Sequence, residues 1–134
     1  MKLKILDLFS GIGGITLGLE RTGGFEASAF CEIDYACRHT LRRHWPKANI
    51  YQDIRNLNYE KLYEDKVLVD VVVGGFPCTE ISNAGKKEGL SGSNSGLWGE
   101  MLRIISQVYP EWAIIENVSA LRSRGLVRVL KDLS

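Results

Sequence analysis

The sequence predicts an α/β fold in which a mostly parallel, doubly wound sheet carries helices on both faces. Short runs of Val, Ile, Leu and Phe alternate along the chain with segments whose apolar residues recur at helical spacing. A glycine-rich turn at residues 10–14 separates the first predicted strand from the first predicted helix. Several predicted strands also end on a polar or reactive side chain, and in such sheets ligands bind at that edge.

The composition is that of one ordinary globular domain. The chain has 134 residues, of which 45% are hydrophobic and 25% charged, and its formal net charge is +1. We therefore expect a single domain over residues 1–134. The near-neutral charge argues against a surface that binds nucleic acid over its whole extent, but a local basic patch remains compatible with it.

The apolar runs and the cysteines indicate the expected location and redox chemistry. The longest apolar runs fall far short of a membrane span, and the first residues lead into a strand pattern instead of a signal peptide. We expect a cytoplasmic protein without a membrane partner. Cys31, Cys37 and Cys78 cannot all pair within the chain, and none has CxxC spacing. A disulfide framework and a zinc site are therefore not expected.

The first half of the chain predicts three strands and two helices. Each predicted strand is a short apolar run. The first helix stops at a glycine pair, and the second can begin at Asp34 as its N-cap and end before Pro46. In chain order the predicted elements are strand 4–9, helix 15–21, strand 25–33, helix 35–45 and strand 48–51.

The second half repeats the alternation around a long polar loop. A loop as long as 78–95 in a compact domain is usually functional or mobile. The segment after Ser95 carries a clean helical stripe of Leu97, Met101, Ile104, Ile105 and Val108. In chain order the predicted elements are a helical turn or short helix at 57–63, strand 67–73, a helix capped by Ser95 and running to about 108, strand 112–116 and helix 126–133.

Cys78 is the first candidate for chemistry. Three valines lead to Gly74, Gly75, Phe76 and Pro77, so the thiol follows a buried strand and a tight loop. A thiol presented at the carboxyl end of a strand can act as a nucleophile. It can equally be a small buried hydrophobe, since free cysteines are among the most buried residues.

The glycine turn and two acids suggest a nucleoside site. Gly11 and Gly13 occupy the first two positions of a dinucleotide fingerprint, while Thr16 replaces its third glycine. Glu32 ends the second strand and can accept hydrogen bonds from two ribose hydroxyls. Asp53 ends the third strand and can accept from an exocyclic amine. A solvated strand end and an ordinary loop acid remain the alternatives for these carboxylates.

Together these motifs resemble the DNA cytosine-5 methyltransferases. The match consists of DLFSGIGG at 7–14, Glu32, Asp53, GFPC at 75–78 and ENV at 116–118, in that order. It covers nearly the whole chain, and the combination is specific although each motif alone is weak. The resemblance implies a Rossmann-like sheet of the S-adenosylmethionine-dependent methyltransferase type, acting on DNA as in bacterial or phage restriction–modification.

The resemblance also implies residue roles. Cys78 would add to carbon 6 of a cytosine flipped out of double-stranded DNA, and Glu116 would contact that base. Ser82 and Asn117 would also contact the DNA substrate. Phe9 would pack on the adenine of the donor, Glu32 would hold its ribose and Asp53 its amine. The residues implied for S-adenosylmethionine are Phe9, Gly11, Gly13, Glu32, Ile33, Asp53, Ile54, Pro77 and Leu97.

The chain departs from the family mainly in length. The family continues with a Gln-x-Arg-type segment, a target-recognition region and a final segment that returns to the donor pocket, and we expect none of these in this chain of 134 residues. We therefore weigh three alternatives: the amino-terminal piece of a longer enzyme, one chain of a two-chain enzyme, and a non-enzymatic remnant that binds donor or a protein partner. In each case we expect little activity from this chain alone. An unrelated NAD-binding enzyme is a distant fourth.

Other side chains are expected to be structural. His39 and His44 lie on a helix that covers the sheet, so we expect surface histidines and no Cys–His hydrolase. The arginines of the same helix, at positions 38, 42 and 43, are expected to form a solvated face. The tryptophans at 45, 98 and 112 are expected to pack within the protein.

Overall fold

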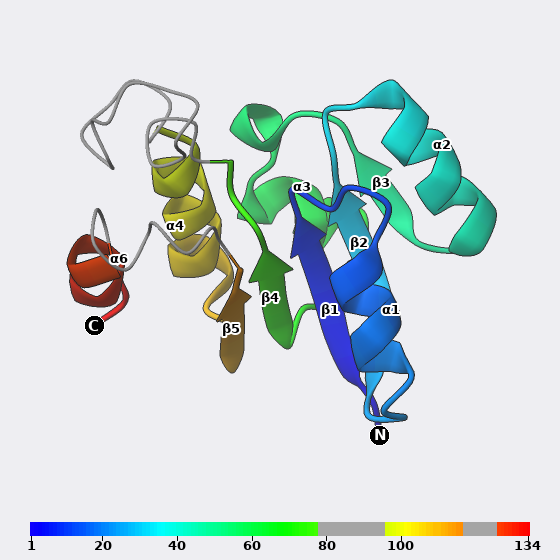
Figure 1. Cartoon of the computed structure of the whole chain (residues 1–134), viewed down its shortest axis with the longest axis horizontal. Coiled ribbons are helices and arrows are strands. Elements are labelled where there is room, and N and C mark those ends of the chain that lie inside the picture. The colour runs from blue at the N-terminus through cyan, green and yellow to red at the C-terminus, as the bar shows by residue number, and fades with distance from the viewer. Residues whose placement is uncertain (78–95, 117–125) are drawn as a thin grey trace.

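The computed structural model of the chain describes residues 1–77, 96–116 and 126–134. Its centre is a five-stranded sheet in the order β3-β2-β1-β4-β5, and every strand pair is parallel. Figure 1 shows the strands side by side with their carboxyl ends at one edge. In chain order the strands are β1 Leu3–Leu8, β2 Phe25–Cys31, β3 Asn49–Tyr51, β4 Val71–Gly74 and β5 Trp112–Ile115.

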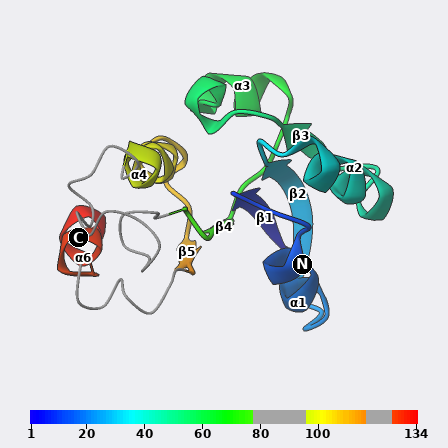
Figure 2. The ribbon, with the colours of Figure 1, turned by 45° about the horizontal axis from the view of Figure 1, so that its top comes forward.

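The helices cover both faces of this sheet (Figure 2). On one face Ile15 and Leu19 of α1 pack against Ile5, Val71 and Val73. On the other face a larger core joins β1, β2 and β4 to the helices α3 and α4. The helices are α1 Gly14–Glu20, α2 Tyr35–His44, α3 Tyr59–Glu64, α4 Gly96–Val108 and α6 Leu126–Leu133, with a single 3-10 turn, η1, at Ile54–Asn56.

The alternation of side chains along β1 explains how one strand serves both cores. Ile5 faces α1, while Leu6 and Leu8 belong to the core on the α4 side, and all three are fully buried. β4 is buried along its whole length, as expected for a central parallel strand. The predicted doubly wound α/β architecture is therefore confirmed.

Two predicted boundaries were wrong. The strand predicted from residue 67 begins only at Val71, because the Lys4 amide donates to the Asp70 carboxylate and regular pairing with β1 starts one residue later. The short helix expected at 57–63 is present as α3, but it begins only at Tyr59, and the 3-10 turn η1 precedes it at Ile54–Asn56. Asn58 separates them and caps α3 by accepting a hydrogen bond from the Lys61 amide at 2.8 Å.

Two of the side-chain predictions also fail. Arg38 is buried, not solvated, and its Nη1 donates to the carbonyls of Glu32 at 3.0 Å and Ile33 at 2.6 Å. Trp112 is 64% exposed, whereas Trp98 is fully buried and Trp45 packs against Phe30 at a ring distance of 4.8 Å. His39 and His44 are exposed, as predicted. Within the described ranges, no helix is long and apolar enough to cross a membrane.

Candidate functional site

A cavity of about 130 Å³ opens at the carboxyl ends of β1, β2 and β3. Its walls are mainly apolar, and two carboxylates stand among them. Seven of the nine residues expected to bind a donor line it, and they come from five different stretches of the chain. The full lining is Phe9, Cys31, Glu32, Ile33, Gln52, Asp53, Ile54, Arg55, Pro77 and Leu97.

Phe9 lines this cavity and has an unusual backbone conformation. It follows the last residue of β1 and has a φ of 53°, in the left-handed region that residues other than glycine rarely adopt. Strain of this kind costs of order 1 kcal/mol and tends to concentrate at functional positions. Phe9 follows the end of the strand, lines the cavity and also packs against the larger core.

Glu32 is held in place by two backbone amides. Its Oε1 accepts from the Gly11 amide at 2.8 Å, and its Oε2 accepts from the Asp34 amide at 2.7 Å. Each carboxylate oxygen can accept a second hydrogen bond. The carboxylate is therefore oriented before any ligand arrives and keeps acceptor capacity on both oxygens.

Asp53 has a comparable local support at the end of β3. Its Oδ1 accepts from the Arg55 amide at 3.0 Å, which makes Asp53 the N-cap of η1. Ile54, the next residue, is buried within the larger core and also lines the cavity. One short turn thus places a polar and an apolar wall residue side by side.

Gly11 and Gly13 do not line the cavity. Gly11 contributes through its amide, which supports Glu32. Gly13 has a φ of 86°, and a Cβ there would lie 2.6 Å from the Trp45 ring. The missing side chain at Gly13 is therefore needed for the approach of α2, and a direct donor contact by either glycine stays a prediction.

Cys31 lies against this cavity and was not anticipated as part of the site. Burial, followed by the nearby charges of Asp53 and Glu32, raises the pKa of its thiol to about 12. A neutral thiol is a poor nucleophile. The buried Cys31 side chain therefore lines the cavity as a small apolar wall residue.

Glu116 lies directly over the backbone of Gly75. A Cβ on Gly75 would come within 2.4 Å of Glu116 Oε2. The Glu116 amide also donates to the Gly74 carbonyl at 2.9 Å, which extends the pairing of β5 with β4. The carboxylate predicted to contact the base is therefore beside the strand end that leads to Pro77. Cys78, Ser82 and Asn117 lie outside the described residues.

A buried pair, Asp7 and Thr16, supports the turn beneath the site. Thr16 Oγ1 donates to Asp7 Oδ2 at 2.6 Å, and both residues are almost completely buried. Burial is the main reason that the pKa of the Asp7 carboxyl rises from 3.8 to about 7. Thr16, at the position of a fingerprint glycine, thus ties α1 to β1.

Arg38 is a residue that sequence reasoning placed wrongly and that supports the site. Its guanidinium binds the two carbonyls that follow β2, next to the Glu32 and Ile33 side chains. Its position three residues before the buried Leu41, on the same face of α2, was the available signal.

Comparisons with curated proteins give relatives of similar sequence. The chain is 38% identical over 120 residues to the Type II methyltransferase M2.BsuMI of Bacillus subtilis, covering 87% of the chain and 29% of that protein. It is 32% identical over 143 residues to the Type II methyltransferase M.AquIA of Picosynechococcus, covering all of the chain and 57% of that protein. The chain thus spans between about a third and just over half of these relatives' length.

Solved structures share the fold. A prophage-encoded E. coli protein described as a DNA modification methyltransferase superposes with a TM-score of 0.79 at 27% identity, covering 97% of this chain and 36% of that one. The methyltransferase EhMeth of Entamoeba histolytica gives 0.76 at 15% identity, covering 99% and 43%, which supports the fold alone.

The family model for C-5 cytosine-specific DNA methylases matches residues 3–133. This match spans β1 to α6 and therefore includes every element that builds the cavity. The chain belongs to the C-5 cytosine-specific DNA methylase family.

Proposed function

We propose that this chain is the donor-binding and catalytic part of an enzyme that transfers a methyl group from S-adenosylmethionine to carbon 5 of cytosine in DNA. The observation that carries the proposal is the convergence of seven expected donor residues around one cavity, with Glu116 beside the Gly75–Pro77 segment. The family supports the reaction class. The bacterial sources of the relatives support action on DNA in a bacterial cytoplasm.

The residues around the cavity fit an adenosine group. Phe9, Ile33, Ile54 and Leu97 offer apolar surface for a planar base. Glu32 offers two acceptors for the two hydroxyls of a ribose, and Asp53 offers an acceptor for the adenine amine. Pro77, the residue before Cys78, also lines the cavity. S-adenosylmethionine, when bound, supplies an electrophilic methyl group on a sulfonium.

Cys78 would provide the covalent step. Its thiolate adds to carbon 6 of the cytosine, and the electron pair displaced from the ring double bond makes carbon 5 nucleophilic. Carbon 5 forms a bond to the methyl group as the carbon–sulfur bond of the donor breaks. A base then removes the proton on carbon 5, and the Cys78 sulfur leaves with its electron pair, which restores the ring.

Glu116 would hold the base during this sequence. Its position over Gly75 keeps the carboxyl beside the segment that carries the nucleophile. Hydrogen bonding from this side to ring nitrogen 3 would stabilise the electron-rich adduct. The target base must leave the DNA stack first, at a cost of a few kcal/mol. Ser82 and Asn117 are proposed to contact the substrate.

Recognition of the DNA sequence is proposed to require polypeptide beyond this chain. The chain spans less than two thirds of the relatives' length, and its net charge of +1 offers little general attraction for DNA. We propose that this polypeptide, continuous with the chain or a second subunit, covers the exposed side of β5. Trp112 and Ile114 on that strand provide apolar surface for it.

Calorimetry tests the donor site. The protein that contains this chain should bind S-adenosylmethionine, and a Glu32→Ala substitution should abolish the measured heat. An Arg42→Lys variant on the exposed face of α2 serves as the control. Binding of a nicotinamide dinucleotide in place of S-adenosylmethionine would instead overturn the assignment of the cavity to this donor.

Covalent trapping tests the nucleophile. DNA that carries 5-fluorocytosine should form a stable adduct with the enzyme, because fluorine on carbon 5 blocks the elimination step. Cys78→Ser should not form this adduct although it still binds the donor. An adduct of equal yield in Cys78→Ser would show that another residue attacks the base.

A further inference from the structure

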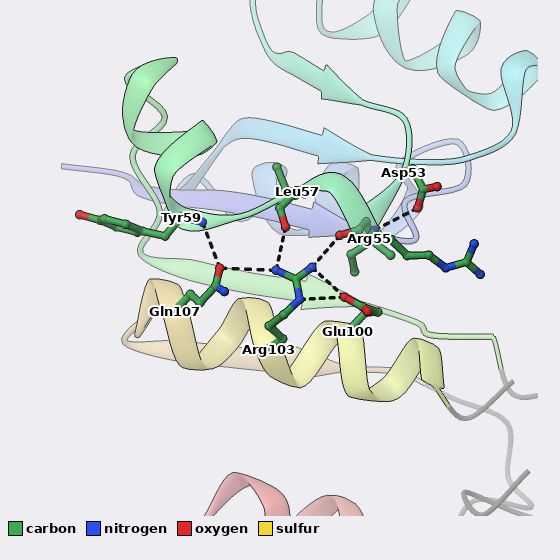
Figure 3. A network of polar contacts seen from close by, with 8 residues as sticks. Asp53, Arg55, Leu57, Tyr59, Glu100, Arg103 and Gln107 are labelled. Atoms are coloured by element: carbon green, nitrogen blue, oxygen red, sulfur yellow. Dashed lines mark hydrogen bonds and ion pairs between the residues drawn. The ribbon is translucent and has the colours of Figure 1, made fainter. Parts of the chain in front are cut away.

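Arg103 in the middle of α4 forms a clamp between this helix and the segment that follows β3 (Figure 3). Its Nη1 donates to the Leu57 carbonyl and its Nη2 to the Ile54 carbonyl, each at 2.8 Å. Glu100 orients the guanidinium. Its Oε2 lies 2.8 Å from Nε and 2.7 Å from Nη2 of Arg103. One planar group thus binds two carbonyls and one carboxylate.

The two carbonyls belong to η1 and the residue that ends it. A single 3-10 turn has few hydrogen bonds of its own and relatively poor geometry, so it depends on tertiary contacts. Within the turn, the Ile54 carbonyl accepts a long hydrogen bond of 3.2 Å from the Leu57 amide. The bond from Arg103 to the same oxygen is shorter and charge-assisted, and it is therefore the stronger of the two.

This turn carries one wall of the donor cavity, and α4 carries the opposite one. Asp53 caps η1 and Ile54 begins it, and both line the cavity. Leu97, at the start of α4, lines it from the other side. The bonds of Arg103 therefore tie α4, which carries Leu97, to the turn that Asp53 caps and Ile54 begins.

We propose that Arg103 is a positioning residue for the donor site, which holds η1 against α4 so that Asp53 can accept the adenine amine. This inference rests on the proposed donor site described above. Arg103 itself does not touch the donor. A lysine in its place carries the charge but lacks the planar fork, so it cannot reach both carbonyls and Glu100 together.

A clamp that only stabilises the fold would make a different prediction. It would lower thermal stability and weaken every ligand of the cavity to the same extent. A clamp that aims Asp53 should instead weaken ligands that carry the exocyclic amine more than ligands that lack it. The two possibilities are separated by comparing S-adenosylhomocysteine with S-inosylhomocysteine, in which an oxygen replaces that amine.

The experiment measures the affinity of both compounds by calorimetry in the protein that contains this chain. Wild-type protein should prefer S-adenosylhomocysteine. Arg103→Lys should lower the affinity for S-adenosylhomocysteine about tenfold, because roughly one charge-assisted hydrogen bond is lost. Its affinity should then be close to that of S-inosylhomocysteine. Glu100→Gln should shift the preference in the same direction by a smaller factor. Arg42→Lys, on an exposed helix face, should leave it unchanged.

The possible failures are distinct. A wild-type preference that persists unchanged in a folded Arg103→Lys protein, as judged by thermal denaturation, overturns the positioning role and leaves the donor site intact. An equal loss for both compounds assigns Arg103 to fold stability alone and also overturns it. Wild-type protein that binds neither compound, or both equally, overturns the proposed use of the cavity and this inference with it.

Discussion

The central strand β1 and the edge strand β5 differ in how completely the rest of the protein covers them. Ile5 on β1 is fully buried between β2, β4 and α1, whereas Ile114 on β5 is 37% exposed although it has the same side chain. The last four residues of β1 are buried, and three of the four residues of β5 are exposed. The cavity proposed for the donor therefore lies beside the well-covered strand β1, whereas Glu116 follows the exposed strand β5.

We propose that this difference separates donor binding from base contact. The donor side needs a rigid cavity, and its walls are fixed by hydrogen bonds from Gly11, Asp34 and Arg103. The β5 side leads toward the proposed base contact and presents apolar surface that further polypeptide would bury. We expect substitutions on the donor side to cost more stability and ligand affinity than matched substitutions on β5.

The largest effect is expected from the buried Asp7. Its pKa is raised from 3.8 to about 7 in the folded protein. Between these values the folded state keeps a proton that the unfolded chain has released, so the free energy of unfolding falls as the pH rises through this window and levels off above it. The contribution lost amounts to at most about 4 kcal/mol. Urea unfolding at pH 5 and pH 8 measures the part lost above pH 5, about 2.7 kcal/mol.

Asp7→Asn is the matched variant for that measurement. Asparagine keeps the shape and can still pair with Thr16, but it has no proton to lose in this range. Its free energy of unfolding should lack the decrease seen in wild-type protein. A pH dependence equal to that of wild type would mean that Asp7 is ionised in the folded state at pH 5 and that the interior tolerates its charge.

Glu32→Gln should reduce the affinity for S-adenosylmethionine about a hundredfold, since two charge-assisted hydrogen bonds weaken and one amide hydrogen faces a backbone donor. Thermal stability should fall by much less, because Glu32 is only half-buried. Calorimetry and thermal denaturation on the same sample separate the two quantities. A variant that binds the donor as wild type does would remove Glu32 from the site.

Gly13→Ala should destabilise the protein by about 3 kcal/mol, because it combines an unfavourable φ with a clash in a packed region. The φ is 86°, and the new Cβ would lie 2.6 Å from the Trp45 ring. Gly11→Ala is the control: its φ is 56°, but nothing lies within 4 Å of the added carbon. That variant should lose only about 1 kcal/mol in urea unfolding. Equal losses would show that α2 adjusts freely around Trp45.

The smallest effect is expected on β5. Ile114→Thr should change the free energy of unfolding of this chain by less than about 0.5 kcal/mol, because the side chain is already partly in water. Val72→Thr on β4 should cost about 2 kcal/mol, since it buries a hydroxyl in a fully apolar position. Urea unfolding of both variants quantifies the difference in stability cost between β4 and β5. Similar losses would mean that β5 is covered as well as β4.

Several features of the fold and site were predictable because they depend on local pattern. The alternation of apolar runs and helical stripes predicted the order of strands and helices. Parallel strands bring their carboxyl ends to one edge of the sheet, so the sequence alone predicted that Glu32 and Asp53 lie close together. The motif combination extended this to Phe9, Ile33, Ile54, Pro77 and Leu97, and all seven line one cavity.

Other features could not be predicted, because their partners lie far away in the chain. Arg103 bonds to residues 46 and 49 positions earlier. Arg38 was assigned to a solvated face because a charged residue on a helix usually is solvated, yet the carbonyls after β2 give it a buried partner. Trp112 was expected to pack within the protein instead of stacking on a base, but its burial depends on what lies beside β5.

The sequence by itself determined the order of the elements, the turn glycines and the identity of the side chains at the strand ends, because periodicity and turn chemistry act over a few residues. Only the tertiary structure decided that Gly13 makes room for Trp45, that Gly75 makes room for Glu116, and that Arg103 joins the two walls of the cavity. These contacts depend on the distance and angle between packed elements, and no pattern within a single element contains that information.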